Sequence, residues 1–161
     1  MTTFELSDST KSKINHWLTK YPADQRRSAV VAALLAAQEQ NNGHLTDDAM
    51  KAGADYLQIP PVEAYEVATF YDMYNLNPIG KHKIAVCTNI SCMLRGSDEI
   101  IAHLKKRLNI DVNETTKDGK FTLREVECLA ACGGAPMCQV NDREYVENLT
   151  CEKMDELLNK L

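Results

Sequence analysis

Four of the six cysteines in this 161-residue chain fall into two close pairs, and their spacing constrains the fold more than any other feature. Four residues separate Cys87 from Cys92, and three separate Cys128 from Cys132. In a reducing compartment such pairs indicate metal binding before disulfides. Four thiolates form a soft-metal site that suits either an iron–sulfur cluster or a structural zinc ion. Because no Cys-x-x-Cys motif occurs, a thioredoxin-type redox dithiol is disfavoured.

Composition and terminal sequence narrow the class of partner. A net charge of −5 argues against binding to a nucleic-acid backbone. No apolar run approaches the roughly 20 residues that span a bilayer, so we expect no direct membrane insertion. The first residues lack the basic start and apolar centre of a signal peptide, which favours a cytoplasmic chain. No dinucleotide fingerprint or P-loop occurs, so we expect no nucleotide to bind here.

Residues 1–77 predict a helical N-terminal region. Thr46 is an expected N-cap, Gly43 an expected helix stop, and Pro61 an expected first-turn residue. The predicted fourth helix runs from Pro61 through Tyr74. Its tyrosines fit either core packing or a surface for a partner protein. The expected apolar faces carry Ile14, Trp17, Leu18, Tyr21, Val30, Val31, Leu34, Leu35, Met50, Ala54, Leu57, Tyr65, Val67, Phe70 and Tyr71.

Residues 78–161 predict a small α/β domain of the thioredoxin-like kind. We expect strands at 83–86 and 121–126, a hairpin of 137–140 with 144–146, and two helices capped by Ser97 and Thr150. The first strand leads into Cys87 and the second into Cys128. The predicted fold class is therefore α+β, an N-terminal helical bundle followed by a thioredoxin-like domain.

The loops around the cysteines favour a [2Fe-2S] cluster. Two ferric ions, two sulfides and four thiolates carry a net negative charge that grows on reduction, so buried sulfurs need backbone N–H donors. Both pairs lead into loops, and Gly133-Gly134 after Cys132 allows close approach of backbone amides. Zinc-binding domains tolerate similar spacings, so both metals remain open at this point.

Longer motifs point to one family. Cys-x4-Cys followed by Cys-Leu-x-Ala-Cys-x-x-Ala-Pro resembles the small [2Fe-2S] subunit of the NADH-oxidising module of respiratory complex I, an NADH:quinone oxidoreductase. The resemblance covers roughly residues 10–160. It also includes Tyr21-Pro22, Gly43-His44-Leu45, Val67-Ala68-Thr69-Phe70-Tyr71, Gly80-Lys81-His82, Gly119-Lys120-Phe121-Thr122-Leu123 and Asn141-Asp142. Ala130 stands where this family commonly has glycine.

The resemblance implies a site and a role. Cys87, Cys92, Cys128 and Cys132 would be the cluster ligands in a thioredoxin-like [2Fe-2S] ferredoxin domain at 78–161. FMN and NADH would bind to a partner subunit, which splits the two electrons of a hydride because one cluster carries only one. The chain would be an electron-transfer subunit, not catalytic alone. Contacts with further peripheral-arm subunits would hold the chain on the cytoplasmic side of the inner membrane. Cys138 and Cys151 lie outside the motif and are expected to be buried or half-buried thiols.

Two other functions fit the sequence. Similar subunits serve NAD-linked hydrogenases and formate dehydrogenases. The alternative from a different class of function is a protein-interaction module that a structural zinc ion stabilises and that has no redox role.

Overall fold

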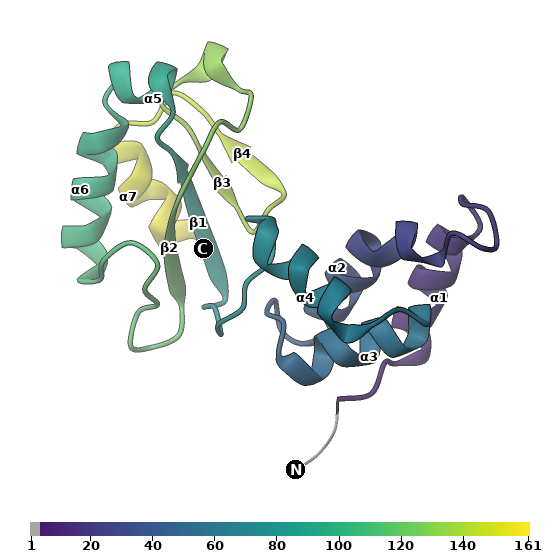
Figure 1. Ribbon diagram of the computed structural model, residues 1–161. Helices are drawn as coiled ribbons and strands as arrows, with labels where there is room; N and C mark the ends of the chain where they lie inside the picture. Colours follow the sequence, from purple (N-terminus) through teal and green to yellow (C-terminus); the bar gives the residue numbers. More distant parts are fainter. Residues whose placement is uncertain (1–3) are drawn as a thin grey trace. The chain divides into compact units, whose positions relative to one another are not determined.

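The computed structural model describes residues 4–161, and the chain divides after Pro78 into two compact units (Figure 1). The N-terminal unit is helical. It contains α1 (Asp8–Leu18), a short 3₁₀ helix (Arg26–Ala29), α2 (Val30–Gln40), α3 (Asp47–Leu57) and α4 (Pro61–Phe70). Its core is made of small and branched apolar side chains, among them the fully buried Ile14, Leu34 and Leu57.

Local capping fixes two of these helices. The Ser7 hydroxyl accepts a hydrogen bond from the Thr10 N–H at the start of α1, and Thr46 does the same for the Ala49 N–H at the start of α3. Each bond satisfies one N–H that the first helical turn leaves without a partner. The predicted cap at Thr46 is confirmed.

The end of α4 differs from the prediction. The helix stops at Phe70, and the extended backbone of Tyr71 turns the chain away. Tyr74 then enters the core beyond the helix, where its hydroxyl donates to the Val31 carbonyl at 3.0 Å. Asn75, expected in a linker, is buried. Its backbone N–H donates to Gln38 Oε1 at 2.7 Å, and its side-chain amide donates to the Gly43 carbonyl at 2.8 Å. Contacts with α2 and with the turn after it therefore hold the segment that follows α4.

The C-terminal unit is a four-stranded sheet with helices. Its elements are β1 (His82–Cys87), α5 (Ile90–Leu94), α6 (Ser97–Leu108), β2 (Phe121–Val126), a 3₁₀ turn (Cys132–Gly134), β3 (Cys138–Val140), β4 (Glu144–Val146) and α7 (Cys151–Lys160). The strand order is β2-β1-β3-β4, with β1 parallel to β2 and the other neighbours antiparallel. The mixture of helices and sheet confirms the α+β prediction.

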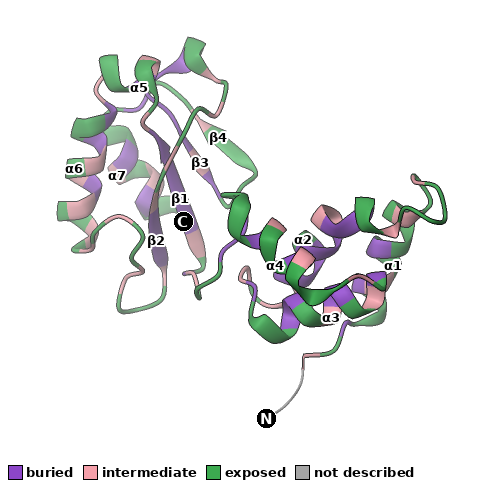
Figure 2. Ribbon diagram, in the orientation of Figure 1, coloured by how far each residue is buried: buried purple, intermediate pink, exposed green. Residues whose placement is uncertain are grey.

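One face of the sheet forms the core of this unit. Figure 2 shows the buried central strands, and the helices α6 and α7 contribute the rest of the cluster. Its members include Ile84, Val86, Ile100, Leu104, Leu123, Met154 and Leu158. Thr150 caps α7 through the Lys153 N–H, as predicted. Asn141 and Asp142, both with positive φ, make the predicted hairpin turn between β3 and β4.

The segment between β1 and α6 was incompletely predicted. A five-residue helix, α5, lies there, and it is too short to show an amphipathic period. Ser97 is not the N-cap of α6; Gly96 occupies that position with φ of 96° and makes no side-chain cap bond. A left-handed residue is needed because the chain turns directly from α5 into α6, and glycine adopts that conformation without strain.

Candidate metal centre

The first cysteine pair is buried. Cys87 is the last residue of β1 and its N–H donates to the Met137 carbonyl at 3.1 Å. Cys92 lies in α5, and its N–H donates to the Asn89 carbonyl at 2.9 Å. The two residues are 3% and 2% exposed. Both therefore belong to a small apolar cluster, to which Ala135 and Met137 contribute.

The second pair is exposed on the loop that follows β2. Cys128 comes two residues after Val126, the partner of Cys87 in the β1–β2 ladder, and Cys132 opens the 3₁₀ turn. Because β1 and β2 are parallel, their carboxyl ends meet at one edge of the sheet. Figure 1 shows α5 and the loop after β2 at this same end of the sheet.

The thiols of Cys87 and Cys132 act on that of Cys92. The pKa of the Cys92 thiol is raised, first by burial, then by a hydrogen bond with Cys87 and by the negative charge of Cys87 and Cys132. A bound cation has the opposite effect, since coordination favours the thiolate.

The donor set fits a two-iron cluster. All six cysteines lie within the described residues and carry free thiols. Between residues 4 and 161, no group of three or more His, Cys, Asp or Glu side chains is arranged to hold a metal ion, so the assignment rests on the type and pairing of the cysteines. A [2Fe-2S] cluster binds four cysteines, two on each iron, so two separate pairs at one edge match its requirement.

The backbone of the second loop supplies one sulfur contact. The Ala130 N–H donates to Cys128 Sγ at 3.3 Å. Ala130 adopts a φ of 62°, in the left-handed region that costs an L-residue roughly 1–2 kcal/mol. Glycine adopts this conformation without strain, so the alanine at this position carries a backbone cost that glycine would not.

The two glycines after Cys132 differ in their surroundings. A β-carbon at Gly133 would meet nothing within 4 Å, whereas one at Gly134 would lie 2.6 Å from Cβ of Glu147. The open space beside Gly133 agrees with the expected close approach of a ligand. Gly134 is instead required by packing against Glu147, a residue that the sequence pattern did not single out. No sequence signal marks Glu147, because it reaches the loop only through the hairpin.

The remaining cysteines lie elsewhere. Cys138 is fully buried in the core shared with α6 and α7, and burial raises the pKa of its thiol to about 12. Cys151 is partly buried at the start of α7.

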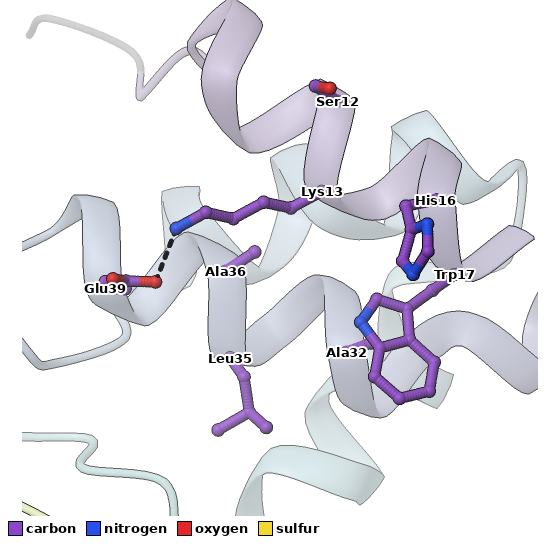
Figure 3. Close-up of a pocket in the computed structure, with 8 residues that line it drawn as sticks. All are labelled: Ser12, Lys13, His16, Trp17, Ala32, Leu35, Ala36 and Glu39. Atoms are coloured by element: carbon purple, nitrogen blue, oxygen red, sulfur yellow. Dashed lines mark hydrogen bonds and ion pairs between the residues drawn. The ribbon is translucent and has the colours of Figure 1, made fainter.

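The N-terminal unit has a hollow of about 400 Å³ between α1 and α2 (Figure 3). Trp17 and Leu35 line it, and a 2.7 Å ion pair between Lys13 and Glu39 borders it. Trp17, predicted on the apolar face of the first helix, is 40% exposed.

The mixed four-stranded sheet with helices α6 and α7 is the architecture of a thioredoxin-like domain. The family model of the thioredoxin-like [2Fe-2S] ferredoxin matches residues 14–161. The chain therefore belongs to the thioredoxin-like [2Fe-2S] ferredoxin family, as the motifs predicted.

Relatives extend over the whole chain. The E subunit of the NADH-quinone oxidoreductase of Rickettsia bellii is 47% identical over 161 residues, which is 100% of this chain and 96% of that protein. The corresponding protein of Rickettsia prowazekii is 51% identical over 143 residues, 89% of this chain and 80% of that protein. Mitochondrial NADH dehydrogenase [ubiquinone] flavoprotein 2 of Dictyostelium discoideum is 46% identical, covering 99% of this chain and 64% of that protein. These names confirm the predicted resemblance to the small subunit.

A solved structure shares the fold. An NAD⁺-reducing [NiFe]-hydrogenase in the air-oxidised state matches 79% of this chain and 22% of that chain, with a TM-score of 0.67 and 23% identity.

Proposed function

We propose that this chain is the electron-transfer subunit of an NADH:quinone oxidoreductase and binds one [2Fe-2S] cluster through Cys87, Cys92, Cys128 and Cys132. The observation that carries the proposal is that parallel strands β1 and β2 bring both cysteine pairs to one edge of the sheet. Support comes from relatives that are named as subunits of NADH-quinone oxidoreductase and align over the full chain.

Each part of the site has a role in this proposal. The four thiolates bind iron, and Ala135 and Met137 exclude water on the buried side. The Ala130 N–H, which donates to Cys128 Sγ, offsets negative charge on that sulfur. The cluster itself supplies a site that takes up and releases one electron at a time.

The chemistry of NADH requires a second subunit. NADH gives a hydride, which carries two electrons, and a flavin can divide them into single electrons. This sequence contains no dinucleotide fingerprint. We therefore assign FMN and the NADH site to a partner subunit of the same complex, with further peripheral-arm subunits beyond it.

We assign the contacts with these partner subunits to two surfaces that carry exposed apolar side chains. In the N-terminal unit, Phe70 is 78% exposed, and Val62 and Tyr65 on α4 are also exposed. In the C-terminal unit, Ile90 and Leu94 lie exposed on α5, the helix that carries Cys92. Large exposed apolar groups gathered on one element are typical of protein interfaces.

Association with the membrane would be indirect. None of the helices described between residues 4 and 161 is long and apolar enough to cross a bilayer. We place the chain on the cytoplasmic side of the inner membrane, held there through the other subunits.

Ligand substitution tests the site. Iron and acid-labile sulfide are assayed in the anaerobically purified chain and in two groups of variants. We expect Cys87→Ser and Cys128→Ser to lose or grossly destabilise the cluster, and Cys138→Ala and Cys151→Ala, the controls, to retain it. A cluster that disappears only in the Cys138 variant would overturn the ligand assignment, and zinc in place of iron and sulfide would favour the interaction module.

A further inference from the structure

Glu147 lies directly against the loop that carries Cys132. A β-carbon on Gly134 would come within 2.5 Å of Cδ and 2.6 Å of Cβ of Glu147, so the side chain lies over the backbone two residues after the cysteine. Gly134 itself is buried, whereas Glu147 is exposed to solvent. The carboxylate thus covers the loop from its solvent side.

Hydrogen bonds hold the Glu147 segment in this place. The N–H of Asn148 donates to the Gly134 carbonyl at 2.6 Å, and the N–H of Leu149 donates to the Pro136 carbonyl at 2.9 Å. On β4, the Tyr145 hydroxyl donates to the Leu129 carbonyl at 3.0 Å. The strand that precedes Glu147 and the turn that follows it are therefore both attached to the loop between Cys128 and Pro136.

One cation faces this segment from α7. The ammonium group of Lys153 donates to the backbone carbonyl of Glu147, and the Lys153 N–H completes the Thr150 cap. Its charge is opposite to that of the Glu147 carboxylate, and its ammonium group lies at the backbone of the residue that covers the loop. Another carboxylate, Glu127, accepts a hydrogen bond from the Asn89 amide at 3.0 Å and adjoins Cys128 in sequence.

Charge beside a cluster alters its reduction potential. Reduction adds one negative charge to the cluster, so a neighbouring carboxylate disfavours the reduced form and a neighbouring ammonium favours it. From this geometry we infer that Glu147 tunes the electron-transfer site by its charge: its carboxylate lowers the reduction potential of the cluster, and Lys153 partly offsets it. This inference rests on the proposed cluster site.

Redox titration of the holoprotein, followed by EPR, measures the effect. Glu147→Gln keeps the shape of the side chain and removes its charge. We expect it to favour the reduced cluster by about threefold to tenfold at fixed potential, which is about 28–59 mV for one electron. Lys153→Gln should shift the potential in the opposite direction. Both shifts should shrink at high salt, since water and ions reach the exposed carboxylate.

Two further variants separate charge from packing. Glu156→Gln removes an exposed carboxylate from α7 beyond Lys153 and should leave the potential unchanged. Glu147→Asp keeps the charge and should shift the potential less than Glu147→Gln. If Glu147→Gln does not retain a cluster, the Lys153→Gln titration decides: a lowered potential supports the inference, and an unchanged one overturns it.

The result also separates the inference from the proposed function. A wild-type chain without a [2Fe-2S] cluster would overturn the proposed function and the inference with it. A wild-type chain that holds the cluster, with the same potential in wild type and Glu147→Gln, would overturn the inference alone. Equal shifts in Glu147→Gln and Glu156→Gln would show a general charge effect and would also overturn it.

Discussion

Replacing Ala130 by glycine should stabilise this protein, although such a change usually weakens one. Ala130 has a φ of 62°, and this conformation costs an L-residue about 1–2 kcal/mol. Glycine avoids that cost, but it lowers the free energy of unfolding by about 0.5–1 kcal/mol because it gives the unfolded chain more conformational freedom. The midpoints of these two ranges differ by about 0.75 kcal/mol, which is the net gain predicted in the free energy of unfolding.

Ala131→Gly is the matched control. Ala131 adjoins Ala130 in the same loop, but its φ is −105°, outside the left-handed region that favours glycine. Glycine there should bring the entropic loss and also remove a methyl group that packs against the cluster around Cys87 and Cys92, so the free energy of unfolding should fall by at least about 0.5–1 kcal/mol. The two substitutions have the same chemistry and opposite predicted signs.

Anaerobic urea titration measures both variants, followed by the visible absorption of the cluster and by far-UV circular dichroism. With a urea dependence of about 1–3 kcal/mol per molar, the midpoints should move by a few tenths molar in opposite directions. The N–H of residue 130 that donates to Cys128 Sγ is present in both alanine and glycine, so the reduction potential should not change. A lower midpoint for Ala130→Gly than for the parent protein would refute the strain argument.

Two other substitutions test packing and partner contact. Gly134→Ala should lower the urea midpoint by the equivalent of about 1–3 kcal/mol, because its β-carbon would collide with Glu147, whereas Gly133→Ala should have little effect because the space beside it is open. Equal losses in both would contradict this explanation. Phe70→Ala should weaken binding to the flavin-bearing subunit by about 1 kcal/mol or more in a titration of the two subunits and leave the visible spectrum unchanged. Unchanged affinity would remove Phe70 from the proposed interface.

Features with a local cause could be predicted from the sequence. Thr46 and Thr150 cap helices because their hydroxyls reach an N–H three residues away. Asn141-Asp142 forms a turn because both residues tolerate a positive φ. Cys87 follows the apolar part of a strand, and the structure places it as the last residue of β1.

Features that depend on distant contacts could not be predicted. The segment that follows the end of α4 at Phe70 is held by Tyr74, whose hydroxyl donates to the Val31 carbonyl on α2. Helix α5 is too short for periodicity, so only its structure shows that Cys92 lies on a helix. The contact of Glu147 with Gly134 arises from the hairpin and has no counterpart in sequence spacing.

The central claim is that the four paired cysteines hold a one-electron [2Fe-2S] cluster that NADH does not reduce without a flavin. The most direct test is a single spectroscopic titration of the anaerobically purified chain, first with NADH and then with dithionite. We predict a coloured protein whose absorption NADH alone leaves unchanged. Dithionite should then bleach it and give an EPR signal of one unpaired electron per chain. A colourless zinc protein, or rapid bleaching by NADH without flavin, would contradict the account.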